Sequence, residues 1–122
     1  MLHLFLDDER DPSDVTWVPG FDHTLDWEVV RSFDEACAFV KTVGVPDVVS
    51  FDHDLGLGKT GLDFAKWLIE YDLDYAVPKP GFAFTVHSMN PVGRENIRAL
   101  VQSYICVRFG HNTDQVGQLL HD

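Results

Sequence analysis

Short apolar runs and longer amphipathic stretches alternate along this chain. An apolar run that stops at turn or charged residues is typical of a buried strand, whereas apolar positions three and four apart are typical of a helix. The runs predict five strands, at residues 2–6, 27–33, 48–51, 81–86 and 105–109. The amphipathic stretches predict three helices, which begin after Ser32, Thr60 and Asn90. Residues 11–26 have no helical period, so we expect a long loop there.

The helix starts carry residues suited to capping. Ser32 and Glu35 have the spacing of a capping box, in which each side chain accepts a hydrogen bond from a backbone N–H of the first turn. Asn90 precedes Pro91, and proline is well tolerated at the first position of a helix. Gly44 ends the first of the three helices.

This order of elements predicts a single α/β domain over residues 1–122. We expect an open, parallel, five-stranded sheet with crossover helices, of the flavodoxin or receiver type, in which a loop replaces the first helix. Ligands of such sheets bind beyond the carboxyl ends of the strands. Three of the predicted strands end in polar residues at that edge, which predicts the position of a site.

Composition narrows the classes of function. The chain has 122 residues, 45% of them hydrophobic, and a formal net charge of −11. Such an acidic protein is a poor partner for duplex DNA or for an anionic membrane, because both attract basic surfaces. We find no membrane-spanning run and no signal peptide. Cys37 and Cys106 lie in apolar stretches without metal-type spacing, so we expect two buried free thiols and a reducing, cytoplasmic location.

Carboxylates follow two of the predicted strands. Asp7 and Asp8 follow the first strand, and Asp52 and Asp54 follow the third. Carboxylates that converge repel one another unless they are protonated or share a cation. A hard divalent ion, Mg²⁺ or Mn²⁺, would satisfy them and keep coordination sites free for a phosphate. The alternative is that these are ordinary turn and cap aspartates.

Further polar residues are expected at the same edge. His87 and Ser88 end the fourth predicted strand, where they could supply a proton shuttle and a phosphate-binding hydroxyl. Arg10 directly follows the first acidic pair and could reach a phosphate. The alternatives are a strand end that caps backbone groups and a surface arginine. His53 lies between two aspartates and is expected to be a supporting or surface residue.

At these positions the sequence resembles the receiver domain of response regulators. In receivers the acidic pair binds Mg²⁺, the aspartate that ends the third strand accepts a phosphoryl group, and a hydroxyl residue contacts that group. The resemblance implies these roles for Asp52 and Ser88. Receivers also use a lysine after the fifth strand, and residues 107–110 contain none. A conventional phosphorylation switch is therefore disfavoured.

A narrower family is more similar, the receiver-like domains named for cyclic-phosphate processing. The shared patterns are L-D-D-x-R-x-P at residues 6–12, F-D-H-D-L-G at 51–56 and V-H-S-x-N-P-x-G at 86–93. The resemblance implies a phosphoesterase dependent on Mg²⁺ or Mn²⁺ that acts on cyclic phosphates, such as RNA ends or nucleotides.

The hypothesis assigns a role to each candidate residue. Asp8 and Asp52 would hold the metal, with help from Asp7 and Asp54. His87 would protonate the leaving oxygen, and Asp52 would take part in catalysis. The phosphate would be oriented by Arg10, Ser88 and Asn90. The alternatives are a binding module for a nucleotide or a protein partner, without turnover, and a phospho-accepting receiver. Whether the protein is an enzyme, and its oligomeric state, stay open at this point.

Overall fold

The computed structural model describes residues 1–56, 58–75 and 81–109. The strands of this part of the chain are β1 (His3–Leu6), β2 (Trp27–Val30), β3 (Val48–Phe51) and β4 (Ala83–Val86). Its helices are α1 (Phe33–Val43), α2 (Gly61–Tyr75) and α3 (Pro91–Phe109), with a short 3-10 helix over Pro12–Asp14. Among these residues no helix has the length and apolar content that a membrane crossing requires.

The strands form one parallel sheet in the order β2-β1-β3-β4. Its register pairs Leu6 with both Val30 and Phe51, and Phe51 with Val86. The strands therefore end level with one another, as the pattern of polar strand ends predicts. The segments that follow β1, β3 and β4 meet at this edge and are the ones that carry the candidate residues.

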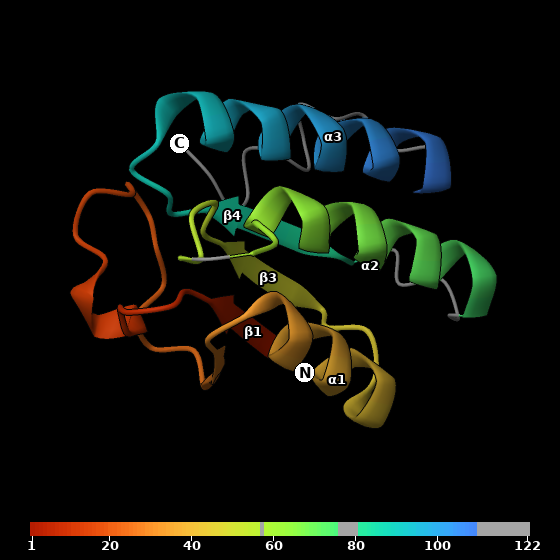
Figure 1. The fold of residues 1–122 in the computed structure, drawn as a ribbon, viewed down its shortest axis with the longest axis horizontal. Coiled ribbons are helices and arrows are strands. Elements are labelled where there is room, and N and C mark those ends of the chain that lie inside the picture. The colour runs from red at the N-terminus through yellow and green to blue at the C-terminus, as the bar shows by residue number, and fades with distance from the viewer. Residues whose placement is uncertain (57, 76–80, 110–122) are drawn as a thin grey trace.

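The two faces of the sheet are covered differently. Helices α1, α2 and α3 lie side by side over one face (Figure 1), where Leu4, Leu6 and Phe84 pack into the main core. On the other face Phe5 packs against residues of the connection between β1 and β2, chiefly Val15 and Phe21. The 3-10 helix is the one regular element that the structure shows in this connection. The apolar side chains of the whole connection cover this face of the sheet as those of a helix would.

The helix starts show how the chain enters each helix. The Ser32 hydroxyl accepts a hydrogen bond from the backbone N–H of Glu35, as a capping box requires. The Glu35 carboxylate accepts from the backbone N–H of Arg31, one residue earlier than expected. The Asn90 side chain accepts from the backbone N–H of Gly93 and so caps α3. The hydrogen bonds of Ser32 and Glu35 at the start of α1 explain why the second strand ends at Val30 and does not reach residue 33.

The predicted fifth strand is wrong, because residues 105–109 form the last turns of α3. Ile97, Val101 and Ile105 lie four residues apart and are all buried, so Ile105 continues the apolar side of the helix. The described sheet has four strands for this reason. Cys37 is buried as expected, whereas Cys106 is exposed, because it lies on the outer side of this helix.

A close backbone approach fixes the start of α2. The Gly61 N–H donates to the carbonyl oxygen of His53, and a Cβ atom at Gly61 would lie 1.6 Å from the carbonyl oxygen of Asp52. No side chain fits in that space without moving the segment that follows β3. Gly61 therefore lets α2 begin directly against the strand end that carries Asp52.

We predict that Gly61→Ala lowers the free energy of unfolding by about 3 kcal/mol or more, because overpacking against backbone leaves little room for relaxation. Urea unfolding would measure the change. Gly81→Ala is the matched control, because Gly81 is exposed and has no atom within 4 Å of its Cβ position. Equal stability of the two variants would contradict the close approach.

Candidate functional site

A cleft of about 220 Å³ opens at the carboxyl edge of the sheet. It is lined by the segments that follow β1, β3 and β4, and every predicted site residue except His87 lies on its wall. The lining residues are Asp7, Asp8, Glu9, Arg10, Asp52, Asp54, Gly56, Ser88, Met89 and Asn90. The strand-end pattern therefore brings the acidic clusters and the phosphate-binding candidates together, as expected.

Asp7 is the most firmly held of the acidic residues. Its side chain is 1% exposed, and its Oδ1 accepts hydrogen bonds from the backbone N–H groups of Glu9 and Arg10, at 2.9 and 2.8 Å. Its Oδ2 lies 3.0 Å from His87 Nε2. Burial alone would raise the pKa of Asp7, but these hydrogen bonds outweigh burial and lower it. Asp7 is therefore charged at neutral pH.

The Asp52 carboxylate accepts fewer hydrogen bonds than that of Asp7. It is 5% exposed, and within the described residues its one hydrogen-bond donor is the backbone N–H of His53, at 2.9 Å. Burial, together with the nearby charge of Asp7, raises the pKa of Asp52 to about 6, although His87, the His53 N–H and Arg10 each lower it in part. A positive charge placed beside Asp52 would stabilise its ionised carboxylate.

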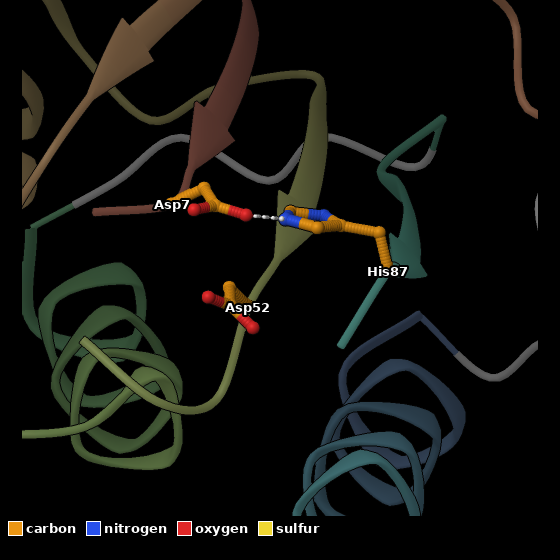
Figure 2. A group of neighbouring side chains, drawn as sticks. All are labelled: Asp7, Asp52 and His87. Atoms are coloured by element: carbon orange, nitrogen blue, oxygen red, sulfur yellow. Dashed lines mark hydrogen bonds and ion pairs between the residues drawn. The ribbon is translucent and has the colours of Figure 1, made fainter. Parts of the chain in front are cut away.

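His87 is not among the residues that line the cleft. Its ring is directed at the Asp7 carboxylate (Figure 2). The ring is fully buried and stacks on Phe5, with 4.3 Å between ring centroids. Nε2 faces Asp7, and Nδ1 lies 2.7 Å from the hydroxyl oxygen of Ser50. The indole N–H of Trp17 donates to the backbone carbonyl of His87. Both ring nitrogens are thus occupied by protein groups.

Asp7, Asp52 and His87 lie close enough together for a metal ion, although in this arrangement Nε2 of His87 is bonded to Asp7. One possible ligand atom from each lies within 4.8 Å of the others, and all three residues are buried. The unbalanced charge of two carboxylates, one of them with a raised pKa, is the condition that a divalent cation relieves. Asp8 and Asp54 lie on the cleft wall and are not members of this buried group.

Asp54 and Asn90 connect two of the loops. The exposed Asp54 carboxylate contacts His53 Nδ1 at 3.0 Å and accepts from the Asn90 side-chain amide at 3.3 Å. The hydrogen bond to His53 is the main reason that the pKa of Asp54 is lowered. A Cβ at Gly93 would lie 2.3 Å from the His53 ring, so the ring packs closely against the first turn of α3. His53 is therefore a supporting residue, as expected.

Arg10 and Ser88 both line the cleft. The Arg10 guanidinium lies over the Trp17 ring, 4.9 Å from its centroid, and 3.4 Å from the sulfur of Met89. Its distance to Asp7 Oδ2 is 4.0 Å. The Ser88 hydroxyl oxygen accepts from the backbone N–H of Asn90, so the hydroxyl proton is left to donate to a ligand.

Three residues that organise the site were not predicted from the sequence. Arg31 donates to the carbonyl oxygens of Asp7 and Arg10, and to the carboxylate of Asp11, and so holds the loop after β1. Ser50 and Trp17 hold His87. Ser50 had a detectable signal, because it is the one polar residue in the apolar run Val48–Phe51.

The raised pKa of Asp52 predicts a pH dependence in metal-free protein. Between pH 4 and 6 the folded state holds a proton on Asp52 that the unfolded state has lost, so stability falls as pH rises through this window. We expect the free energy of unfolding of the wild type to fall by about 1–3 kcal/mol between these limits, and this fall should be absent in Asp52→Asn. Urea unfolding in EDTA, as a function of pH, would measure it. Parallel profiles for the two proteins would contradict the shift.

Comparisons with known proteins agree with this architecture. The family model described as the cyclic-phosphate processing receiver domain matches residues 2–103. A solved structure, titled as a yeast Spc42 trimeric coiled coil (amino acids 181–211) fused to another protein, aligns with a TM-score of 0.54 and 14% identity. The alignment covers 95% of this chain and 82% of that chain, and it shows a likeness of fold alone. Among curated proteins none matches. The chain belongs to the family of cyclic-phosphate processing receiver domains.

Proposed function

We propose that this protein is a metal-dependent phosphoesterase that acts on cyclic phosphates. The observation that carries the proposal is the buried pair of carboxylates, Asp7 and Asp52, at the base of a cleft that also presents Arg10 and Ser88. A divalent cation between the carboxylates and a phosphate on its open side would balance the charges of both.

Mg²⁺ or Mn²⁺ is the proposed cofactor. Asp8 and Asp52 would hold the ion, with help from Asp7 and from Asp54, whose carboxylate is positioned by His53 and Asn90. The bound ion would polarise the phosphoryl oxygens and lower the pKa of a water molecule. The nucleophile is that water or the Asp52 carboxylate itself.

The remaining residues have roles in binding and orientation. The phosphate would be oriented from the wall of the cleft by Arg10, Ser88 and Asn90. We assign His87 to holding Asp7, because both of its ring nitrogens are hydrogen-bonded in the interior and leave no path to a leaving oxygen. This assignment replaces the expected role of proton donor.

The charge of the cleft favours a small substrate. Its wall carries five carboxylates, those of Asp7, Asp8, Glu9, Asp52 and Asp54, against the single guanidinium of Arg10. One bound divalent ion leaves this surface negative. The flanking phosphates of an RNA end need basic or aromatic contacts, and among the described residues the wall offers none beyond Arg10. A nucleotide with one cyclic phosphate is therefore preferred over an RNA end.

A binding module is the second candidate. The placement of His87 favours it, because no histidine is among the residues that line the cleft. A metal and a phosphate could then be bound without turnover. Both candidates are compatible with a cytoplasmic location, since Cys37 and Cys106 are free thiols.

We predict that millimolar Mn²⁺ or Mg²⁺ raises the thermal midpoint relative to EDTA, because the ion binds only the folded arrangement of carboxylates. At a free-ion concentration of about 100 times Kd the stabilisation would be about 2.7 kcal/mol. The double variant Asp8→Asn with Asp52→Asn should show no shift. An unchanged midpoint in the wild type, or an equal shift in the double variant, would argue against the metal site.

We further predict turnover of adenosine 2′,3′-cyclic monophosphate in the presence of Mn²⁺ or Mg²⁺. Asp52→Asn should lower kcat/KM by about 100-fold or more, since the bound ion supplies several kcal/mol of stabilisation to the transition state. Asp74→Asn, an exposed aspartate at the end of α2, is the control and should keep full activity. Product formation would be followed by chromatography.

The same assay separates the alternatives. Saturable binding of the cyclic nucleotide without product would replace the phosphoesterase by the binding module. A stable aspartyl phosphate at Asp52 after treatment with acetyl phosphate, detected by mass spectrometry, would favour the phospho-accepting receiver. A hexanucleotide that ends in a cyclic phosphate should be a poorer substrate than the mononucleotide, and the reverse order would contradict the preference for a small substrate.

A further inference from the structure

A buried chain of hydrogen bonds links three strands behind the cleft. It runs from the Ser50 hydroxyl to Nδ1 of His87, at 2.7 Å, and from Nε2 of His87 to Oδ2 of Asp7, at 3.0 Å. None of the three side chains is more than 1% exposed. The chain thus ends on the carboxylate that forms the base of the cleft, and Figure 2 shows the ring of His87 directed at Asp7.

The chemistry of the groups sets the direction of the protons along this chain. A charged carboxylate only accepts hydrogen bonds, so Nε2 must carry the proton that lies between His87 and Asp7. In a neutral imidazole the other nitrogen is then an acceptor. The Ser50 hydroxyl is the group that donates to it. Without that hydroxyl, Nδ1 would be a buried acceptor with no partner, and the ring would lose one of the two contacts that hold its nitrogens.

Two neighbouring side chains, those of Phe5 and Trp17, keep the ring in place through contacts that do not involve its nitrogens. Phe5 stacks on the ring face, and Trp17 binds the backbone carbonyl of His87. Neither contacts Nδ1 or Nε2. Thr85 offers a natural comparison, because it pairs with Ser50 in the register of β3 and β4 and is also buried. Its hydroxyl has no hydrogen-bond partner in the described structure.

We propose that Ser50 is a positioning residue of this site. Its hydroxyl donates to Nδ1 and so holds the ring of His87 with Nε2–H directed at Asp7. His87 in turn holds Oδ2 of Asp7 in the orientation that a bound cation requires. The inference rests on the proposed function only in assigning a cation to Asp7. It adds a residue that touches neither the cleft nor the cation.

The tautomer of His87 can be measured without any metal or substrate. Nitrogen-15 NMR of the imidazole, in EDTA at about pH 8 where histidine is ordinarily neutral, reports which nitrogen carries the proton. A His87→Gln variant identifies the signals. We expect Nε2–H in all three proteins, the wild type, Thr85→Val and Ser50→Ala. The Nδ1 signal should shift in Ser50→Ala, where its hydrogen bond is lost, and should match the wild type in Thr85→Val. A proton on Nδ1 in the unmodified protein would overturn the proposal, and this measurement needs no variant to fold.

The consequence for Asp7 can be measured as cation affinity. Titration with Mn²⁺, with free Mn²⁺ followed by electron paramagnetic resonance, should show about tenfold weaker binding in Ser50→Ala, the scale expected when a supporting hydrogen bond is lost. Thr85→Val removes a buried hydroxyl that has no partner and should change the affinity by less than about twofold. Equal losses in the two variants would reduce Ser50 to a packing residue. Direct Mn²⁺–nitrogen coupling would also overturn the proposal, because His87 would then be a ligand.

The two levels of the hypothesis can fail separately. If the tautomer and the Mn²⁺ affinities follow these expectations while no cyclic phosphate is hydrolysed, the phosphoesterase fails and the role of Ser50 stands. If hydrolysis occurs and Ser50→Ala leaves both the Nδ1 signal and the affinity unchanged, the role of Ser50 fails and the phosphoesterase stands.

Discussion

The burial of two carboxylates at one edge of the sheet is the constraint on which the site depends. Asp7 receives two backbone N–H groups and His87, and its loop is held by Arg31. Asp52 receives one backbone N–H, which does not offset its burial, so its pKa is raised to about 6. Hydrogen bonds therefore stabilise one charge and leave the other to be balanced from the cleft. This asymmetry would favour a cation in the cleft, because a positive charge beside Asp52 stabilises its ionised form.

The connection between β1 and β2 joins this constraint to the rest of the fold. Its apolar residues Val15 and Phe21 pack on Phe5, and Phe5 stacks on the ring of His87. Its Trp17 contacts both Arg10 and the backbone of His87. A helix in this position would cover the sheet equally well, but the irregular path also places the Trp17 ring against the guanidinium of Arg10, a residue of the cleft wall. The same packing that completes the core thus orients side chains of the site.

The sequence predicted those parts of the site that follow from topology. Parallel strands of matched length end together, so polar residues after three apolar runs had to meet, whichever way each side chain turned. The orientation of His87 needed more information. Phe84 and Val86 face the helices, so a continued alternation would turn His87 toward the face that holds Phe5. The strand predicted at 105–109 failed for a related reason, because alternating Ile105, Val107 and Phe109 fits a strand locally, while the spacing from Ile97 and Val101 fits a helix over a longer range.

The buried chain behind Asp7 also bears on which cation the proposed site would select. While His87 donates from Nε2 to Asp7, the groups that face the cleft are carboxylate and hydroxyl oxygens, the ligands that Mg²⁺ and Mn²⁺ prefer. If the opposite tautomer were stable, Nε2 would have a free lone pair beside two carboxylates, a ligand set suited to Zn²⁺ and other borderline-soft ions. The bond from His87 to Asp7, which Ser50 supports from behind, would therefore keep nitrogen out of the ligand set. Ser50 and His87 have no exposed surface, so this preference would come from the folded core and not from the exposed side chains of the cleft wall.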